Sequence, residues 1–241
     1  MGKSQSIVLT GINHYFGNKQ VLHGINLSIP SSLIYGLLGP SGCGKTTTVK
    51  IMSGIMEATS GTVVVEDIKM PNLNMMQKLG YMAQSDALYT SLTAEENLTF
   101  FGSLYGVPKE RLKYKIEEVM SLVNLKNDIK KVTSAYSGGM KRRLSLAISL
   151  LHEPDILILD EPTVGIDPIL RKTIWDELNN LAQKGMTIIV TTHVMDEADK
   201  CHQLAMMRDG FLIAQGTPQK LISDIGASNI EEAFILYGKG E

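Results

Sequence analysis

The feature that most constrains the fold is a glycine-rich segment, Gly39–Thr46, which reads GPSGCGKT. It matches the pattern G-x-x-x-x-G-K-S/T at every fixed position. An apolar run at 33–38 precedes it, and a helix is expected from about Gly44 to Ser53. Glycines let successive backbone N–H groups turn inward around an anion, and the following helix N-terminus adds partial positive charge. The segment therefore predicts a strand–loop–helix unit that binds the phosphates of a nucleotide.

Individual residues of this loop have distinct expected roles. Lys45 can reach the β- and γ-phosphates, and the Thr46 hydroxyl is placed to ligate Mg²⁺. Cys43 lies near a helix N-terminus and Lys45, which both lower a thiol pKa, so we expect it to react with alkylating agents. The residues expected to bind nucleotide here are Gly39, Pro40, Ser41, Gly42, Cys43, Gly44, Lys45, Thr46 and Thr47.

A second candidate site follows the apolar run at 156–159, which ends in Asp160 and Glu161. Buried acids are costly, so a buried strand that ends in two of them usually presents them to a site. The alternative is a strand end that reaches solvent, where acids are common. The phosphate loop upstream favours a catalytic pair, in which Asp160 holds Mg²⁺ and Glu161 polarises the attacking water.

The pattern of apolar residues changes along the chain. Short β-type runs dominate to about residue 87, helical periodicity fills about 88–154, and β/α alternation returns from 155 to 241. Thr93 and Glu96 form a predicted capping box at the start of the helical stretch. We expect one domain, 1–241, with an α/β core (1–87 and 155–241) interrupted by a helical insert (about 88–154).

Composition sets limits on the class of protein. The 241 residues include 23 basic and 25 acidic ones, so no strong attraction to nucleic acid is expected. No apolar run reaches the roughly 18 residues of a membrane span, and the first ten residues lack a signal-peptide core. The 2 cysteines suggest neither a disulfide framework nor a zinc cluster. These limits favour the cytoplasm.

Five further segments fall in an order that resembles the nucleotide-binding subunits of ABC transporters, along essentially the whole chain. Residues 136–140, YSGGM, resemble the LSGGQ signature of that family. Residues 164–167 look like its D-loop. The single residues that match family positions are Gln84 of the Q-loop, the switch histidine His193 and Phe16, which stands where the family stacks an aromatic ring on adenine.

The resemblance implies an α/β, P-loop NTPase (RecA-like) core with an N-terminal antiparallel β region and an inserted α-helical subdomain. It implies an ATPase in which two subunits sandwich two ATP molecules head to tail. The partners implied are a second ATPase subunit, identical or closely related, and integral-membrane permease subunits at the cytoplasmic face of the membrane, with no nucleic acid. The implied catalytic residues are Glu161, His193 and Gln84, the metal ligands are Thr46, Gln84 and Asp160, and Ser137, Gly138 and Gly139 bind the partner's ATP.

Departures from the family pattern are few. Tyr136 and Met140 replace Leu and Gln of the signature, and Ala83 precedes Gln84 where proline is common. The YSGGM form, followed by Lys141-Arg142-Arg143, looks most like exporters of drugs, antibiotics, lipids or polysaccharides with separate permeases. Import is the alternative direction, and the resemblance implies that the contacts with the cargo lie in the permease.

Two other classes compete with this interpretation. A non-transport ABC ATPase that acts on DNA or ribosomes usually has long coiled-coil insertions or two cassettes, and presents basic surfaces. Here the basic runs at 126–131 and 141–143 are interpreted as solvated helix faces. A P-loop kinase or GTPase would have no use for Ser137-Gly138-Gly139, and no guanine-reading N-K-x-D segment occurs.

Overall fold

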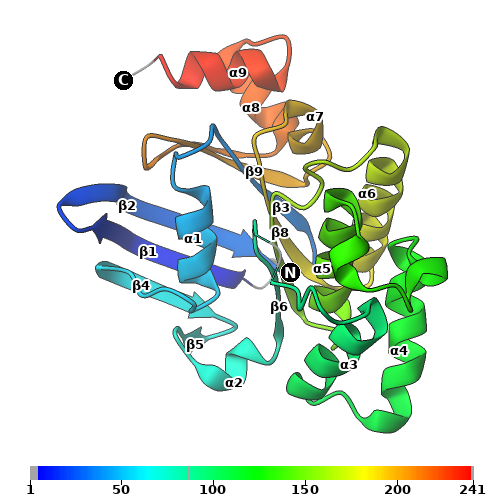
Figure 1. The fold of residues 1–241 in the computed structure, drawn as a ribbon. Helices are drawn as coiled ribbons and strands as arrows, with labels where there is room; N and C mark the ends of the chain where they lie inside the picture. Colours follow the sequence, from blue (N-terminus) through cyan, green and yellow to red (C-terminus); the bar gives the residue numbers. More distant parts are fainter. Residues whose placement is uncertain (1–4, 86, 240–241) are drawn as a thin grey trace.

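The computed structural model describes residues 5–85 and 87–239, and its strands form two sheets (Figure 1). A four-stranded sheet has the order β2-β1-β4-β5, and a six-stranded sheet has the order β10-β9-β3-β8-β7-β6. The strands are β1 Gln5–Phe16, β2 Lys19–Pro30, β3 Ile34–Leu38, β4 Ser60–Val65, β5 Ile68–Lys69, β6 Leu79–Met82, β7 Ile156–Asp160, β8 Thr187–Thr192, β9 Gln203–Arg208 and β10 Phe211–Gly216.

The helices cover both sides of the larger sheet. They are α1 Lys45–Met52, α2 Leu73–Met76, α3 Ala94–Leu104, α4 Lys109–Leu122, α5 Gly138–Leu150, α6 Pro168–Gln183, α7 Met195–Ala198, α8 Pro218–Ile225 and α9 Ile230–Tyr237, with 3₁₀ turns at Lys126–Asp128 and Thr133–Ala135. Figure 1 shows α3 to α6 on one side and the four-stranded sheet with α1 on the other. This arrangement confirms the predicted fold class.

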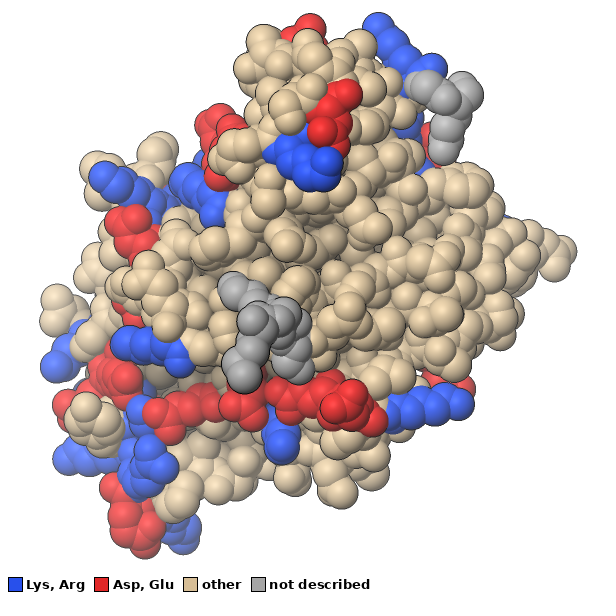
Figure 2. Space-filling view, turned by 180° about the vertical axis from the view of Figure 1, so that it is seen from behind, with Lys and Arg blue, Asp and Glu red and all other residues tan. Residues whose placement is uncertain are grey.

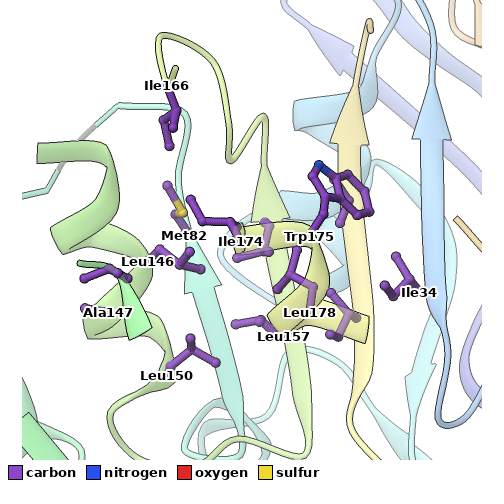
Figure 3. Close-up of a cluster of buried hydrophobic side chains, with 14 of the residues drawn as sticks. Ile34, Met82, Leu146, Ala147, Leu150, Leu157, Ile166, Ile174, Trp175 and Leu178 are labelled. Carbon is purple, nitrogen blue, oxygen red and sulfur yellow. The ribbon is translucent and has the colours of Figure 1, made fainter. Parts of the chain in front are cut away.

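The central strands of the larger sheet are buried on both faces, as their continuous apolar runs predict. Every residue of β3, β7 and β8 is buried. Because side chains alternate along a strand, Leu157 and Leu159 pack into one apolar cluster while Ile156 and Ile158 pack into another. Figure 3 shows the first cluster, where Leu157 of β7 lies among side chains of α5 and α6.

The parallel strands determine where the connecting loops lie. β3 pairs in parallel with β8, β8 with β7, and β7 with β6. The carboxyl ends of these four strands therefore meet at one edge of the sheet. In open α/β sheets, ligands bind in the crevice outside this edge.

The helical stretch between β6 and β7 begins with the predicted capping box. The Thr93 N–H donates to Glu96 Oε2 at 2.7 Å, and the Glu96 N–H donates to Thr93 Oγ1 at 3.2 Å. Both groups would otherwise be unpaired at the start of α3. The domain boundaries given above stay a prediction.

Two regions differ from the sequence-based expectation. β1 and β2 are each 12 residues long, because register shifts along their pairing let the strands continue past the short alternating runs. The helices α8 and α9 were not predicted, although Thr217 caps α8 and Pro218 follows it, which is a standard helix start.

The surface offers two general observations. Within the described residues, no helix is both long and apolar enough to cross a membrane. On the face seen in Figure 2, Lys and Arg of the described residues are interspersed with Asp and Glu rather than gathered in one basic surface.

Candidate nucleotide site

A cleft of about 300 Å³ lies at the sheet edge where the four parallel strands end. It is lined by Phe16, Val21, Ser41, Gly42, Gly44, Lys45, Thr46, Thr47, Gln84 and Glu161. All of these except Val21 were singled out in the sequence. The structure thus brings together the phosphate loop after β3, the glutamine after β6, the acid after β7 and the aromatic residue of β1.

The phosphate loop takes its shape from glycines with left-handed backbone conformations. Gly42 has φ 83° and Gly44 has φ 104°. A Cβ on Gly44 would lie 2.6 Å from Leu22 Cδ2, so β2 leaves no room for a side chain. Gly44 caps α1 without a side-chain hydrogen bond, which leaves the first-turn N–H groups of that helix available to an anion.

Lys45 lies almost fully inside this loop. The residue is 4% exposed. Its Nζ donates hydrogen bonds to the carbonyls of Gly39 at 2.7 Å and Pro40 at 2.9 Å. Carbonyl acceptors offset the cost of removing the ammonium from water. The positive charge is therefore held at the loop itself.

The expected lowering of the Cys43 thiol pKa is wrong. The residue is 2% exposed, and burial raises the pKa of its thiol despite the opposing effect of Lys45. The side chain packs inward, where its Sγ lies 2.7 Å from the position a Cβ on Gly39 would take. Loss of solvation for the thiolate outweighs the positive neighbour. Cys43 is a packing residue of the loop.

Asp160 ends β7 and is fully buried. Its Oδ1 accepts a hydrogen bond from Thr191 Oγ1 at 2.5 Å, while its Oδ2 is buried and has no hydrogen-bond partner among residues 5–85 and 87–239. A buried carboxylate oxygen needs a compensating partner, and hard divalent cations bind such oxygens. The buried Oδ2 of Asp160 and the hydroxyl of Thr46, which lines the cleft, are both oxygens of the kind that Mg²⁺ binds.

Glu161 has a strained backbone. Its φ of 53° lies in the left-handed region, which costs a non-glycine residue roughly 1–2 kcal/mol. Its N–H donates to Thr191 Oγ1 at 3.0 Å, which helps to hold this conformation. Strain of this kind concentrates at functional sites, where the surrounding structure imposes it.

Gln84 and His193 converge on the Glu161 side chain, which is 11% exposed. Glu161 Oε2 accepts from Gln84 Nε2 at 3.4 Å, and Oε1 lies 3.2 Å from His193 Nδ1. The glutamine, the acid and the histidine follow three different strands, so the sheet edge positions all of them. Such a cluster can hold a water molecule against a phosphate.

The signature segment lies apart from the cleft. Ser137 caps α5 by accepting a hydrogen bond from the Met140 N–H at 3.3 Å. Ser137 and Gly138 are exposed, and a Cβ on Gly139 would lie 3.0 Å from the Gly165 carbonyl. Among the described residues, the signature does not line the cleft of its own chain.

Sequence reasoning missed several residues that support the site. Thr191 bonds both acids, as described above. Glu197 is 3% exposed and accepts hydrogen bonds from the hydroxyls of Thr163 and Thr192, which ties the segment after β7 to the segment after β8. Glu197 lies on the short helix α7, and nothing in the sequence around it predicts that this acid is buried. His14 packs edge-on against Phe16, with ring centroids 4.8 Å apart.

The expectation for Arg142 is wrong. This residue was expected on a solvated helix face, but it is buried, with 6% exposure. It lies one turn before Leu146 and two turns before Leu150 on α5, and both leucines are buried. The i, i+4, i+8 spacing is the signal that could have placed Arg142 on the buried face.

A second, largely apolar cavity of about 450 Å³ lies beside the cleft, between β6 and the start of the helical stretch. Its lining includes Ala83 and Ser85, on either side of Gln84, together with Leu88, Phe101 and Leu104. Leu104 is 67% exposed, and neighbouring Tyr89 and Phe100 are also exposed. Contiguous exposed apolar residues of this kind mark interaction surfaces.

Comparisons with known proteins agree with this geometry. A family model described as "ABC transporter" matches residues 22–164. The chain is 44% identical over 227 residues to the probable multidrug ABC transporter ATP-binding protein YbhF of Escherichia coli, covering 91% of this chain and 39% of that protein. It is 39% identical over 227 residues to the Nod factor export ATP-binding protein I of Burkholderia lata, covering 92% and 73%.

The fold also has close structural neighbours. A solved structure titled "Structure of ATP binding subunit of ABC transporter" superposes with a TM-score of 0.89 at 22% identity, covering 96% of this chain and 99% of that one. The chain spans about two fifths of the length of the YbhF protein. The match over residues 22–164 and these identities lead to one conclusion: the chain belongs to the ABC transporter family, as one of its ATP-binding domains.

Proposed function

We propose that this chain hydrolyses MgATP as one of two paired subunits and drives the movement of separate membrane permeases, in the direction of export. The observation that carries the proposal is the convergence of Lys45, Thr46, Gln84 and Glu161 on one cleft at the ends of parallel strands. Cation, hydroxyl, amide and carboxylate are the groups that phosphoryl transfer to water requires.

The residues of the cleft have separate tasks. Backbone N–H groups of the loop and Lys45 bind the β- and γ-phosphates, and the Phe16 ring, which is 51% exposed, stacks on adenine. Thr46, Asp160 and Gln84 would hold Mg²⁺, which neutralises charge on the phosphates. Glu161 accepts a proton from the attacking water, and His193 orients its carboxylate from 3.2 Å.

A second subunit completes each site. The exposed N-terminus of α5, with Ser137, Gly138 and Gly139, presents N–H groups and a positive helix end to an anion. Because these residues do not line the cleft of their own chain, the γ-phosphate that they bind belongs to the partner. The partner is a second copy or a close relative.

The apolar cavity beside Gln84 is the docking site for a cytoplasmic helix of the permease. Its aromatic and aliphatic lining suits the apolar face of a helix, and it shares the segment around Gln84 with the nucleotide cleft. A permease helix in this cavity would contact the segment that carries Gln84, so a movement of Gln84 would displace that helix. The chain would then lie at the cytoplasmic face of the membrane.

Export is favoured over import by two observations. The signature has the YSGGM form, and one relative carries the word export in its name. The mixed charges of the rear face give no support to a nucleic-acid partner.

Glu161→Gln tests the proposal. We expect the variant to bind MgATP, because the loop and Lys45 are untouched, and to lose turnover by roughly 10²–10³-fold, because the amide accepts no proton. It should also accumulate as a closed dimer with MgATP, seen by size-exclusion chromatography. A variant that keeps near wild-type turnover removes Glu161 from this role, and a variant that stays monomeric contradicts the paired site.

A further inference from the structure

Two consecutive arginines of α5, Arg142 and Arg143, lie in different surroundings. Arg142 is 6% exposed and faces the sheet edge, whereas Arg143 is partly exposed and faces the helical stretch. A guanidinium has five N–H donors in a rigid plane, so burial demands several acceptors in fixed positions. The acceptors found by Arg142 therefore indicate what it holds in place.

The guanidinium of Arg142 donates to four backbone carbonyls in two loops. Nη1 donates to the carbonyls of Ala83 at 2.6 Å and Gln84 at 2.9 Å. Nη2 donates to the carbonyl of Glu161 at 2.7 Å and to that of Asp160, and Nε donates to the Glu161 carbonyl at 3.2 Å. One side chain thus joins the segment after β6 to the segment after β7.

These carbonyls belong to residues that line or border the cleft. The side chains of Gln84 and Glu161 meet at 3.4 Å although the residues are 77 positions apart in sequence. Their backbones leave neighbouring parallel strands, where carbonyl groups no longer have sheet partners and need others. Arg142 supplies those partners, and so fixes the backbone that carries both side chains.

The same helix carries the signature. Arg142 lies five residues after Ser137, so it moves with the helix end that faces the partner's nucleotide. A shift of α5 on closure of the pair would pull on the carbonyls that hold Gln84 and Glu161. The connection runs through one buried, hydrogen-bonded guanidinium and one helix.

We propose that Arg142 is a positioning residue: it sets the placement of Gln84 and Glu161 and makes that placement depend on the position of α5. This rests on the proposed function for its effect on turnover, but its effect on the two loops does not. These hydrogen bonds of Arg142 go to the carbonyls of residues 83, 84, 160 and 161, whereas the phosphates are expected to bind the loop at 39–47, so we expect nucleotide affinity to change less than turnover.

Arg143 provides a matched control. Its Nη1 donates to the carbonyls of Val123 and Asn124, both at 2.9 Å, and its Nε donates to that of Gly139 at 3.4 Å. It therefore makes the same kind of bond on the same helix, to carbonyls of the helical stretch, although Asp167 also acts on its charge. Arg143→Gln measures what the loss of an arginine costs here without disturbing the two catalytic loops.

The experiment compares Arg142→Gln, Arg142→Lys and Arg143→Gln in the full chain. The first readout is amide hydrogen exchange without nucleotide. We expect Arg142→Gln to speed exchange at 83–85 and 161–166, and Arg143→Gln to speed it at 123–126 instead. Unchanged exchange at both catalytic loops in a folded Arg142→Gln protein overturns the inference, whatever the protein's activity.

The second readout is steady-state ATPase activity. Small displacements of catalytic groups can cost about 100-fold, so we expect that loss of kcat in Arg142→Gln with KM for MgATP within about threefold. Arg142→Lys should recover part of kcat, because an ammonium donates to some of the same carbonyls without the planar fork. Arg143→Gln also loses a long bond of 3.4 Å to Gly139 of the signature, so we expect some loss of kcat, but one at least about tenfold smaller than that of Arg142→Gln.

Two activity results contradict the inference. One is an equal loss of kcat in Arg142→Gln and Arg143→Gln, which indicates a general packing role. The other is a rise in KM as the main effect of Arg142→Gln, which places Arg142 in nucleotide binding. A wild-type chain without turnover contradicts the proposed function instead, and the exchange experiment still decides the role of Arg142.

Discussion

The phosphate loop and the N-terminus of α5 are both glycine-rich helix starts, but they differ in their exposure to solvent. The loop is enclosed: Cys43 and Lys45 are 2% and 4% exposed, and α1 begins without a side-chain cap. The α5 start is exposed at Ser137 and Gly138, and Ser137 caps its own helix. In the proposed function, one wall of the nucleotide site is thus built into the core, and the other is presented at the surface.

The difference explains why such a chain would act in pairs. A helix start that is solvated and turned away from its own cleft can bind an anion supplied from outside. In the phosphate loop, by contrast, the carbonyls of Gly39 and Pro40 hold the Lys45 ammonium within a single chain. Nucleotide binding should therefore depend on one chain, and turnover on two.

The enclosed character of the loop can be tested chemically at Cys43. Burial raises the pKa of its thiol, so less reactive thiolate is present at a given pH. We expect alkylation of the native chain at pH 7 to be at least about tenfold slower than in the denatured chain, and to keep rising with pH beyond the point where an ordinary thiol levels off.

Mass-spectrometric mapping measures both cysteines in one sample. Cys201 is 4% exposed and its thiol pKa is also raised by burial, so it serves as a buried thiol far from the loop in sequence. Rapid modification of Cys43 at neutral pH, at the rate of the denatured chain, would show that the loop is open.

A smaller effect is expected at the exposed wall. Ser137→Ala removes a helix cap and should cost about 1 kcal/mol of stability, or about 2–4 °C in Tm. Thr217→Ala removes the equivalent cap of α8, where Thr217 Oγ1 accepts from the Lys220 N–H at 3.1 Å. Calorimetry should give similar losses for both, while ATPase assays show a loss of turnover for Ser137→Ala alone. Equal turnover in the two variants would show that Ser137 acts only as a helix cap and has no role in turnover.

Local patterns predicted the parts of the site that are local. The phosphate loop is one continuous segment with a required strand before it and helix after it. Asp160 and Glu161 end an apolar run, which forms the buried strand β7. In each case, the signal and the structure lie within about fifteen residues.

Contacts between distant segments were not predictable in this way. The convergence of Gln84 and His193 on Glu161 joins residues 77 and 32 positions apart, and only the family resemblance suggested it. The burial of Cys43 and Arg142 depends on which neighbouring elements pack over them. The charge near Cys43 suggested a lowered thiol pKa, and the run of three basic residues at 141–143 suggested a solvated face. Burial of Cys43 and of Arg142 outweighed both signals.

The most direct test of the central claim compares ATP binding by isolated monomers of Lys45→Ala and Ser137→Arg. Lys45→Ala removes the cation enclosed in the loop and should abolish binding, with a loss of at least about 100-fold in affinity, because a buried charged contact to phosphate is lost. Ser137→Arg adds bulk and charge to the exposed wall, so it should bind ATP with wild-type affinity and fail to turn it over. If Ser137→Arg abolishes binding in the monomer as thoroughly as Lys45→Ala, the signature acts on its own chain's nucleotide and the two-wall account is wrong.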